Sequence, residues 1–208
     1  MPLCQEYNIG SVSVAVWRIT ESSEQLASLV APEYVVEAAS ISNERRRKEW
    51  LAVRVLLPML CGKGARIVYD ADGKPSLAGA GGFISISHTK GYAVLGYSAE
   101  TPFGVDVELL GRDASSAAPR FMKESEIALL SPNDAAKAML VRWCVCEAMF
   151  KLVGNVGGTY KDNIILNSPL PANDGTLEVF LSGCSRLPDS KFIASLVESK
   201  EFLVTVCI

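Results

Sequence analysis

The sequence predicts an α+β fold in which one chain forms two similar lobes, residues 1–99 and 100–208. Stretches with helical periodicity and short strand-like stretches occur in both halves, in similar proportion. The length of 208 residues also allows two lobes of roughly 100 residues each. The polar segment "SAETP", residues 98–102, is the expected hinge between them. No residue-level repeat relates the halves, so a pseudo-duplication would lie in the order of their elements.

The first half begins with a strand and continues with helices. In "SVSVAVWRI", residues 11–19, valine alternates with serine and alanine, which predicts a half-buried strand. Asn43 is a favourable N-cap for a long helix that runs to about residue 60 and ends before Gly62. Two shorter helices are expected before it, at 22–30 and 32–39. Strands separated by turns are expected after it, at 65–70, 83–87 and 92–98.

The second half begins with the strand-like segment "FGVDVELL", residues 103–110. Its apolar residues are interrupted by two carboxylates, Asp106 and Glu108. Helices are expected at 121–130 and 134–153. Further strands are expected at 163–166, 177–181, 192–197 and 202–208. The last two should form a hairpin across "ESKE", residues 198–201.

The composition excludes several classes of function. A formal net charge of −3 gives no nucleic-acid footprint, which normally requires a basic surplus. The segment "MPLCQEYNIG" has neither the charged nor the apolar region of a signal peptide, so none is expected, and no apolar run is long enough to span a membrane. Six scattered cysteines indicate free thiols in a reducing cytoplasm rather than disulfides. We therefore expect a cytoplasmic protein that binds neither nucleic acid nor membrane, and two lobes in one chain favour a monomer.

The paired carboxylates require a positive partner. Asp106 and Glu108 lie two apart on a strand, so they share one face and repel each other. Trp143, Glu147 and Lys151 are spaced by four and form one stripe on a helix that is otherwise mostly apolar. Glu147 can be half of an exposed ion pair with Lys151, or a third carboxylate of the same site. Three carboxylates without a cluster of His or Cys suit Mg²⁺.

A second group of polar residues points to phosphate binding. His88, the only histidine, ends an apolar strand beside Ser87, and Lys74 lies in the turn "DGKP". Such groups hold phosphates by charge-assisted hydrogen bonds, although a lone histidine is often structural. A Ser–His hydrolase triad is not expected, because adjacent strand residues point to opposite faces and no G-x-S-x-G turn occurs. Glu126 can stabilise a helix N-terminus or take part in chemistry.

These motifs, in this order, resemble those of the 4′-phosphopantetheinyl transferases of the longer, two-lobed (Sfp-type) class. The resemblance spans roughly residues 44–158. The pattern G-[IV]-D-[IV]-E, followed about 40 residues later by W-x-x-x-E-A-x-x-K, is its most specific part. The matching segments are "RRRKEWLAVR", "GKP", "SISH", "GVDVE", "FMKESE" and "WCVCEAMFK". The chain departs from the family at Cys144, where Ser or Thr is usual, and at Cys146, where Lys is usual.

The resemblance implies a two-lobed, pseudo-duplicated fold with the site at the lobe interface. It also implies transfer of the phosphopantetheine arm of coenzyme A to a serine of an acyl or peptidyl carrier protein, with release of adenosine 3′,5′-bisphosphate. By match, Asp106, Glu108 and Glu147 would hold Mg²⁺, and Glu147 or Glu126 would accept the serine proton. Lys151 would neutralise the leaving phosphate. The residues expected to bind coenzyme A are Arg47, Arg54, Lys74, Ser87, His88 and Lys151.

Two other functions remain compatible with the same residues. One is a non-catalytic binder of coenzyme A or of a carrier protein, which would be expected to lack a metal ligand. The other is a Mg²⁺-dependent phosphohydrolase that uses the same carboxylates. Because carriers are typically acidic, we expect the transferase to present a docking surface of basic and apolar residues near Phe121, Met122 and Lys123.

Overall fold

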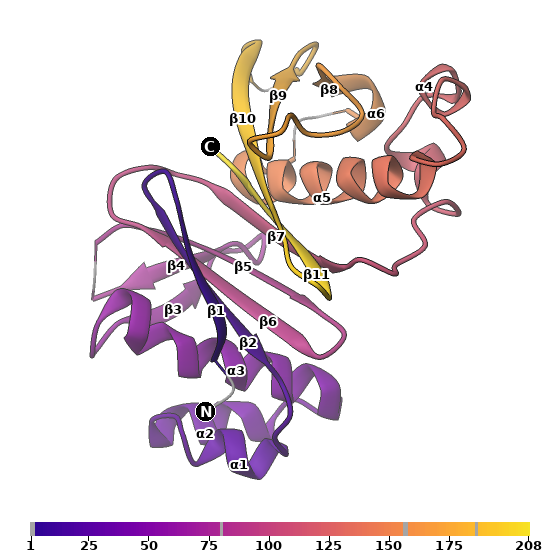
Figure 1. The fold of residues 1–208 in the computed structure, drawn as a ribbon. Helices are drawn as coiled ribbons and strands as arrows, with labels where there is room; N and C mark the ends of the chain where they lie inside the picture. Colours follow the sequence, from indigo (N-terminus) through magenta and orange to yellow (C-terminus); the bar gives the residue numbers. More distant parts are fainter. Residues whose placement is uncertain (1–2, 80, 156–157, 186) are drawn as a thin grey trace. The chain divides into compact units, whose positions relative to one another are not determined.

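The computed structural model describes residues 3–79, 81–155, 158–185 and 187–208, and it confirms the mixed α+β class (Figure 1). The chain divides into two compact units, Met1–Pro102 and Phe103–Ile208. The sequence placed this boundary between residues 99 and 100. Within the described ranges, no helix combines the length and the apolar character needed to cross a bilayer.

The first unit is built on an antiparallel sheet of four strands in the order β1-β2-β6-β5. The strands are β1 (Leu3–Ile9), β2 (Val12–Arg18), β5 (Phe83–Thr89) and β6 (Tyr92–Ser98). A separate hairpin joins β3 (Arg66–Tyr69) to β4 (Pro75–Ala78). The helices are α1 (Ser23–Ala27), α2 (Pro32–Ala39) and α3 (Glu44–Cys61).

The long helix α3 packs against the central strands β2 and β6. It begins as expected, because the Asn43 side chain accepts a hydrogen bond of 3.0 Å from the backbone N–H of Arg46. It ends at Gly62, whose φ of 84° lies in the left-handed region that favours glycine. The core between the helix and the sheet includes Trp17, Leu51, Leu56 and Leu95, all fully buried.

The second unit is built on an antiparallel sheet of five strands in the order β7-β11-β10-β9-β8. The strands are β7 (Gly104–Leu109), β8 (Ile164–Leu166), β9 (Thr176–Leu181), β10 (Ser190–Glu198) and β11 (Phe202–Cys207). The expected hairpin of the last two strands is confirmed. The helices are η1 (Ala118–Arg120), α4 (Glu124–Ala128), α5 (Ala135–Val153) and α6 (Tyr160–Asn163).

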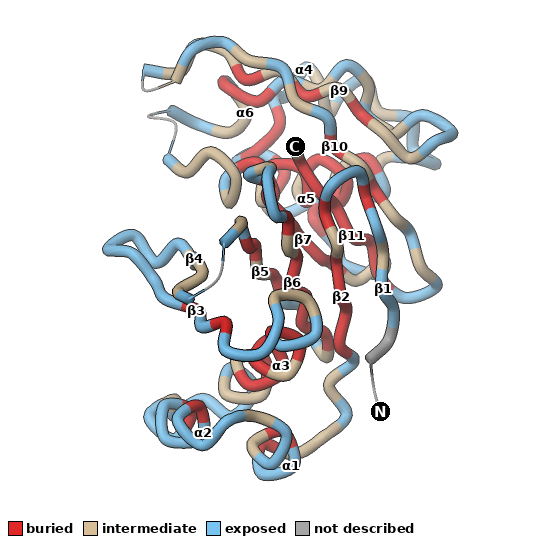
Figure 2. The backbone as a smooth tube through the Cα atoms, turned by 90° about the vertical axis from the view of Figure 1, so that its left-hand side faces the viewer, coloured by how far each residue is buried: buried red, intermediate tan, exposed pale blue. Residues whose placement is uncertain are grey.

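Helix α5 packs against β7 and β11, and these three elements are largely buried (Figure 2). The approach of α5 to β7 is close enough to require glycine. A Cβ on Gly104 would lie 1.9 Å from the carbonyl oxygen of Ala148 in α5. The absence of a side chain at Gly104 therefore sets which residues of the helix face which residues of the strand.

The two units share an order of elements. In each, a strand is followed by a long helix and later by a hairpin, and the last strand pairs with the first. These sets are β2-α3-β5-β6 in the first unit and β7-α5-β10-β11 in the second. In both, the long helix packs against the pair made by the first and last of these strands.

Candidate functional site

The carboxylate strand presents its acidic side chains to α5. Asp106 and Glu108 follow Gly104 at intervals of two, so all three positions lie on the strand face that the helix covers. Both side chains are buried, with 4% of Asp106 and 6% of Glu108 exposed. Buried carboxylates of this kind need donors or cations close by.

The stripe of α5 that the sequence indicates supplies those donors. The indole Nε1 of Trp143 donates to Glu108 Oε1 over 3.0 Å. The ammonium of Lys151 donates to Asp106 Oδ1 over 2.8 Å and to the carbonyl of Val105 over 2.9 Å. Trp143 and Lys151 therefore each bind one of the two carboxylates of the strand. Glu147 lies between them on the same side of the helix.

Glu147 is half-buried and lies in the electric field of this group. Burial is the main cause that raises its pKa, and the negative charge of Asp106 raises it further. The positive charges of Lys151 and Arg112 act in the opposite direction. The Asp106 carboxylate on the strand is thus close enough to Glu147 on the helix to influence the ionisation of Glu147.

Arg112 completes the cluster and was not found from the sequence. It forms an ion pair with Glu108, and its guanidinium carbon lies 4.8 Å from the centroid of the Trp143 ring. The guanidinium thus contacts both partners of the Glu108–Trp143 hydrogen bond. The only local signal was its spacing of four from Glu108, which is uninformative outside a helix.

The carboxylate oxygens of this cluster are ligands of the type that Mg²⁺ prefers. Thr205 pairs with Asp106 across the strands, so their side chains share a face. Its hydroxyl is buried and has no hydrogen-bond partner in the described part of the chain. However, no group of three His, Cys, Asp or Glu side chains in the ranges described above is arranged so that it could hold a metal ion. Lys151, Arg112 and Trp143 hold the carboxylates instead.

Glu126 lies in the short helix α4 and contacts two elements. Its Oε2 accepts a hydrogen bond of 2.7 Å from the backbone N–H of Lys123, so it caps its own helix as expected for a structural role. Its Oε1 lies 3.9 Å from the Nη2 of Arg142 in α5. The side chain is 37% exposed, which leaves it accessible to a substrate.

The expected apolar docking surface at the start of this segment is wrong. Phe121 is 0% exposed and Met122 is 5% exposed, because both belong to the core of the second unit. The Phe121 ring packs edge-on against Trp143, with centroids 5.4 Å apart. Of the three residues proposed for docking, only Lys123 is exposed.

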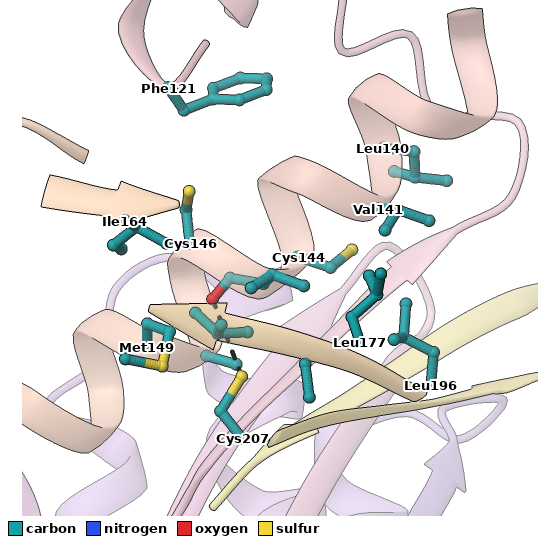
Figure 3. Packing of buried hydrophobic residues seen from close by; sticks show 14 of the residues in the cluster. Phe121, Leu140, Val141, Cys144, Cys146, Met149, Ile164, Leu177, Leu196 and Cys207 are labelled. Carbon is teal, nitrogen blue, oxygen red and sulfur yellow. Dashed lines mark hydrogen bonds between the residues drawn. The ribbon is translucent and has the colours of Figure 1, made fainter. Parts of the chain in front are cut away.

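Cys144 and Cys146 are core residues, and they point to different sides of α5 (Figure 3). Burial raises the pKa of the Cys146 thiol to about 12, and it also raises the pKa of Cys144. Both thiols are therefore protonated near neutral pH and are poor nucleophiles and poor metal ligands.

In the first unit, His88 contacts a carboxylate that sequence reasoning missed. Its Nδ1 lies 3.3 Å from Glu49 of α3, which is only 4% exposed. Arg45 and Arg46 also lie within 3.7 Å of the same carboxylate. A buried carboxylate at Nδ1 fixes the orientation of the imidazole, as acidic partners of functional histidines do.

The two helix arginines expected to bind coenzyme A have different surroundings. Arg54 is 3% exposed, and its guanidinium carbon lies 3.6 Å from the Trp50 ring centroid, while its Nη2 donates to the Tyr69 hydroxyl over 3.1 Å. Burial lowers its pKa. Arg47 is more exposed and donates from Nε to the carbonyl of Ile41 over 2.9 Å. Arg54 therefore supports an aromatic cluster, whereas Arg47 holds the loop before α3.

The remaining expected phosphate ligands lie on β5 and in a turn. Ser87 is buried, whereas the His88 side chain that follows it is 37% exposed, as expected for neighbours on a strand. Lys74 ends the turn between β3 and β4, where its backbone N–H donates to the Asp70 carboxylate over 2.8 Å. The β3–β4 hairpin also carries Tyr69, the partner of Arg54.

Comparison with models of known protein families finds no match. A search among curated proteins likewise finds no chain with significant similarity. The function proposed below therefore rests on the residues and on their geometry.

Proposed function

We propose that this chain is a Mg²⁺-dependent 4′-phosphopantetheinyl transferase that uses coenzyme A and an acyl or peptidyl carrier protein. The observation that carries the proposal is the contact between two distant motifs. In "GVDVE" and "WCVCEAMFK", Glu108 bonds Trp143 and Asp106 bonds Lys151, although these residues lie 35 and 45 positions apart. The two most specific motifs of the resemblance therefore form one polar cluster.

The cluster suits the transfer of a phosphoryl-linked group, which depends mainly on positioning and on neutralising charge on oxygen. A Mg²⁺ ion held by Asp106, Glu108 and Glu147 would neutralise the diphosphate of coenzyme A. Lys151 reaches one of these carboxylates, Asp106, from α5, and its ammonium would offset negative charge on the departing phosphate.

The reaction requires an acceptor for the proton of the carrier serine. The serine oxygen bonds to the phosphorus next to the pantetheine arm, and the bond from that phosphorus to the departing adenosine 3′,5′-bisphosphate breaks. Glu147, whose pKa is raised by burial and by Asp106, binds a proton more readily near neutral pH than an ordinary carboxylate does. Glu126 is the other acceptor, and its exposed position suits contact with a protein substrate.

We assign the polar groups of the first unit to coenzyme A. His88, whose Nδ1 contacts Glu49, and the exposed Lys74 would donate to phosphate oxygens. Ser87 and Arg47 are assigned to the same ligand. Arg54 is enclosed by Trp50 and Tyr69, so we assign it to the wall of the site. It would reach a phosphate only if these two aromatic side chains moved aside.

We also propose that the two units arose by duplication of one strand–helix–hairpin module. This proposal is supported by the shared pairing of the first and last strands and by the matching position of α3 and α5 on that pair. A single chain with both modules is proposed to act as a monomer in the cytoplasm.

The test is to incubate the purified chain with coenzyme A, Mg²⁺ and a panel of apo-carriers. Mass spectrometry should show that at least one carrier gains the mass of the phosphopantetheine arm. Asp106→Asn should abolish the gain because it removes the charge that would hold Mg²⁺, while the matched change Asp134→Asn, at an exposed carboxylate before α5, should not. Absence of a gain with every carrier refutes the transferase, and release of phosphate from a nucleotide without any carrier would favour the phosphohydrolase.

A further inference from the structure

Arg142 is a buried cation in the middle of α5 that the proposed function does not use. Only 2% of the residue is exposed. A guanidinium remains charged in proteins and carries five N–H donors, so a buried one needs both acceptors and a negative charge nearby. The partners of Arg142 therefore indicate which part of the unit it organises.

Those partners lie in the segment that leads into α4 and at the start of β8. The Nε of Arg142 donates to the carbonyl of Phe121 over 2.9 Å, and its Nη2 donates to the carbonyl of Ile164. Its Nη2 also lies 3.9 Å from Glu126 Oε1, which supplies the negative charge. The Nη1 is buried and finds no hydrogen-bond acceptor among the residues that the structure describes.

The Glu126 carboxylate is thus held from two sides. One oxygen accepts from the backbone N–H of Lys123, and the other faces Arg142. Helix α4 has five residues, none of them fully buried, and of these Ile127 packs against the core. The contacts of Arg142 with Phe121 and Glu126 add polar links between this segment and α5.

The position of Arg142 also bears on Cys146, where the resembling family has lysine. The two residues are four apart on α5 and share a side of the helix. Figure 3 shows the Cys146 side chain on the side of α5 where Phe121 and Ile164, the carbonyl partners of Arg142, also lie. Cys146 therefore lies one helical turn from the arginine, and it directly precedes Glu147.

We propose that Arg142 is a positioning residue that supplies, from one helical turn earlier, the cation that a lysine at position 146 would supply. It fixes the Glu126 carboxylate and the Phe121–Glu126 segment in the orientation needed for transfer. This inference rests on the proposed function, because it gives Glu126 a part in that reaction. Arg142 itself acts through Glu126 and does not touch the substrate.

The first test replaces the cation with an apolar side chain of similar length. In Arg142→Met, kcat should fall about 10- to 100-fold because the carboxylate is no longer held in place. The KM for coenzyme A should stay within about 2-fold. Backbone amides 123–127 should exchange hydrogen faster at a temperature where the protein is folded. The matched control is Lys137→Met, at a lysine on the same helix, which breaks an exposed ion pair with Glu198 of β10 and should change neither readout.

The second test asks whether the cation can be supplied from position 146. Adding Cys146→Lys to Arg142→Met should restore the protection of amides 123–127 and much of kcat. In a Glu126→Gln background, Arg142→Met should lower kcat by less than about 2-fold further, because both changes act on one group. An unchanged kcat for folded Arg142→Met, or a failure of Cys146→Lys to restore either readout, would overturn the proposal.

Two further outcomes are distinguishable. If the unmodified chain modifies no carrier, the proposed function fails, and hydrogen exchange alone then decides whether Arg142 holds the Phe121–Glu126 segment. Unchanged amide protection in Arg142→Met would overturn that role. A loss of amide protection that Cys146→Lys reverses would support it. If Arg142→Met does not fold, Arg142→Lys takes its place. Lysine keeps the charge but loses the planar fork, so amide protection should fall only in part, whereas full protection would overturn the proposal.

Discussion

The ion pair between Asp106 and Lys151 should contribute both to the stability of the fold and to the proposed reaction. Asp106 is almost fully buried, whereas the Lys151 side chain is 24% exposed. Removing one partner from such a pair leaves the other with an uncompensated desolvation cost, which normally exceeds the loss at a surface pair. The lysine should therefore contribute to folding as well as to catalysis.

We predict that Lys151→Met lowers the free energy of unfolding by about 2 kcal/mol, since it removes a charge-assisted bond to a buried carboxylate. It should also lower kcat more than it weakens coenzyme A binding, because its proposed action is on the leaving phosphate. Denaturant unfolding and steady-state kinetics measure the two effects. The control Lys191→Met breaks an exposed pair with Glu178 and should cost less than about 1 kcal/mol. Equal costs for both variants would contradict the structural role.

Glu147 gives a prediction about pH. Its folded-state pKa is raised by burial and then by Asp106, so ionising it costs more in the folded state than in the unfolded state. Below the unfolded-state pKa, both states hold the proton and there is no penalty. As the pH rises through the interval between the two pKa values, the penalty develops, and it stays constant above the folded-state pKa.

Glu147→Gln should therefore raise the thermal midpoint of the metal-free protein near pH 8 and change it little near pH 4. Thermal unfolding at both pH values measures the difference. Added Mg²⁺ should raise the midpoint of the unmodified protein more than that of the variant, since ligand binding to the folded state stabilises it. A stabilisation of equal size at both pH values would show that ionisation of Glu147 is not the cause.

At the scale of elements, the site depends on the register between α5 and β7. Trp143 and Lys151 meet Glu108 and Asp106 only if the helix lies at one position along the strand. The close approach at Gly104 fixes that position, because the helix backbone occupies the space of a side chain. The glycine of the "GVDVE" motif thus has a packing reason that is separate from metal binding.

We predict that Gly104→Ala lowers the free energy of unfolding by about 3 kcal/mol, because the added Cβ must displace the backbone of α5. It should also lower transfer activity by shifting the stripe of α5 along β7. The matched control is Gly111→Ala in the turn after β7, where an added Cβ meets nothing within 4 Å. Denaturant unfolding of the two variants compares them directly, and similar losses would refute the close approach as the cause.

Periodicity predicted most elements well because their burial follows a regular pattern. The expected helices at 32–39 and 134–153 correspond closely to α2 and α5, and the hairpin of β10 with β11 was also expected. Strand β1 was missed, since "LCQEYNI" lacks a regular apolar alternation. The helix expected at 121–130 is shorter in the structure, where α4 spans only Glu124–Ala128. Phe121 and Met122 lie before it and belong to the core.

The residues of the candidate site and their partners could be predicted from the sequence only in part. The carboxylates and the stripe of α5 stood out because charges in apolar segments are unusual. Arg112, Arg142 and Glu49 did not, since their significance depends on elements that are distant in sequence. Arg142 contacts carbonyls 21 and 22 residues away, and no local pattern indicates such partners.

At the scale of the whole molecule, the similar element orders of the two units explain why the sequence suggests duplication without showing a repeat. In both units the long helix covers the pair formed by an early strand and the last strand. That packing requires apolar residues on one side of each element but not the same residues. Only the second unit carries paired carboxylates on its first central strand, so the proposed metal site belongs to one module.

The net charge of the chain determines whether it attracts a charged partner at long range. The chain carries 20 basic and 23 acidic residues, hence a net charge of −3, so it should not attract an acidic carrier at long range. Binding would then depend on local basic residues. Since Phe121 and Met122 are buried, Lys123 and its exposed neighbour Arg120 remain as the local positive surface beside Glu126.

Lys123→Gln and Lys200→Gln separate local from global charge, since each changes the net charge from −3 to −4 and both lysines are exposed. Lys200 lies in the turn between β10 and β11. If local charge steers docking, only Lys123→Gln should raise the KM for the carrier, by about 2- to 5-fold at low salt. The difference should shrink at about 0.5 M NaCl, where screening is strong. Equal effects of the two variants would assign docking to the field of the whole molecule, and no effect of either would place the carrier elsewhere on the surface.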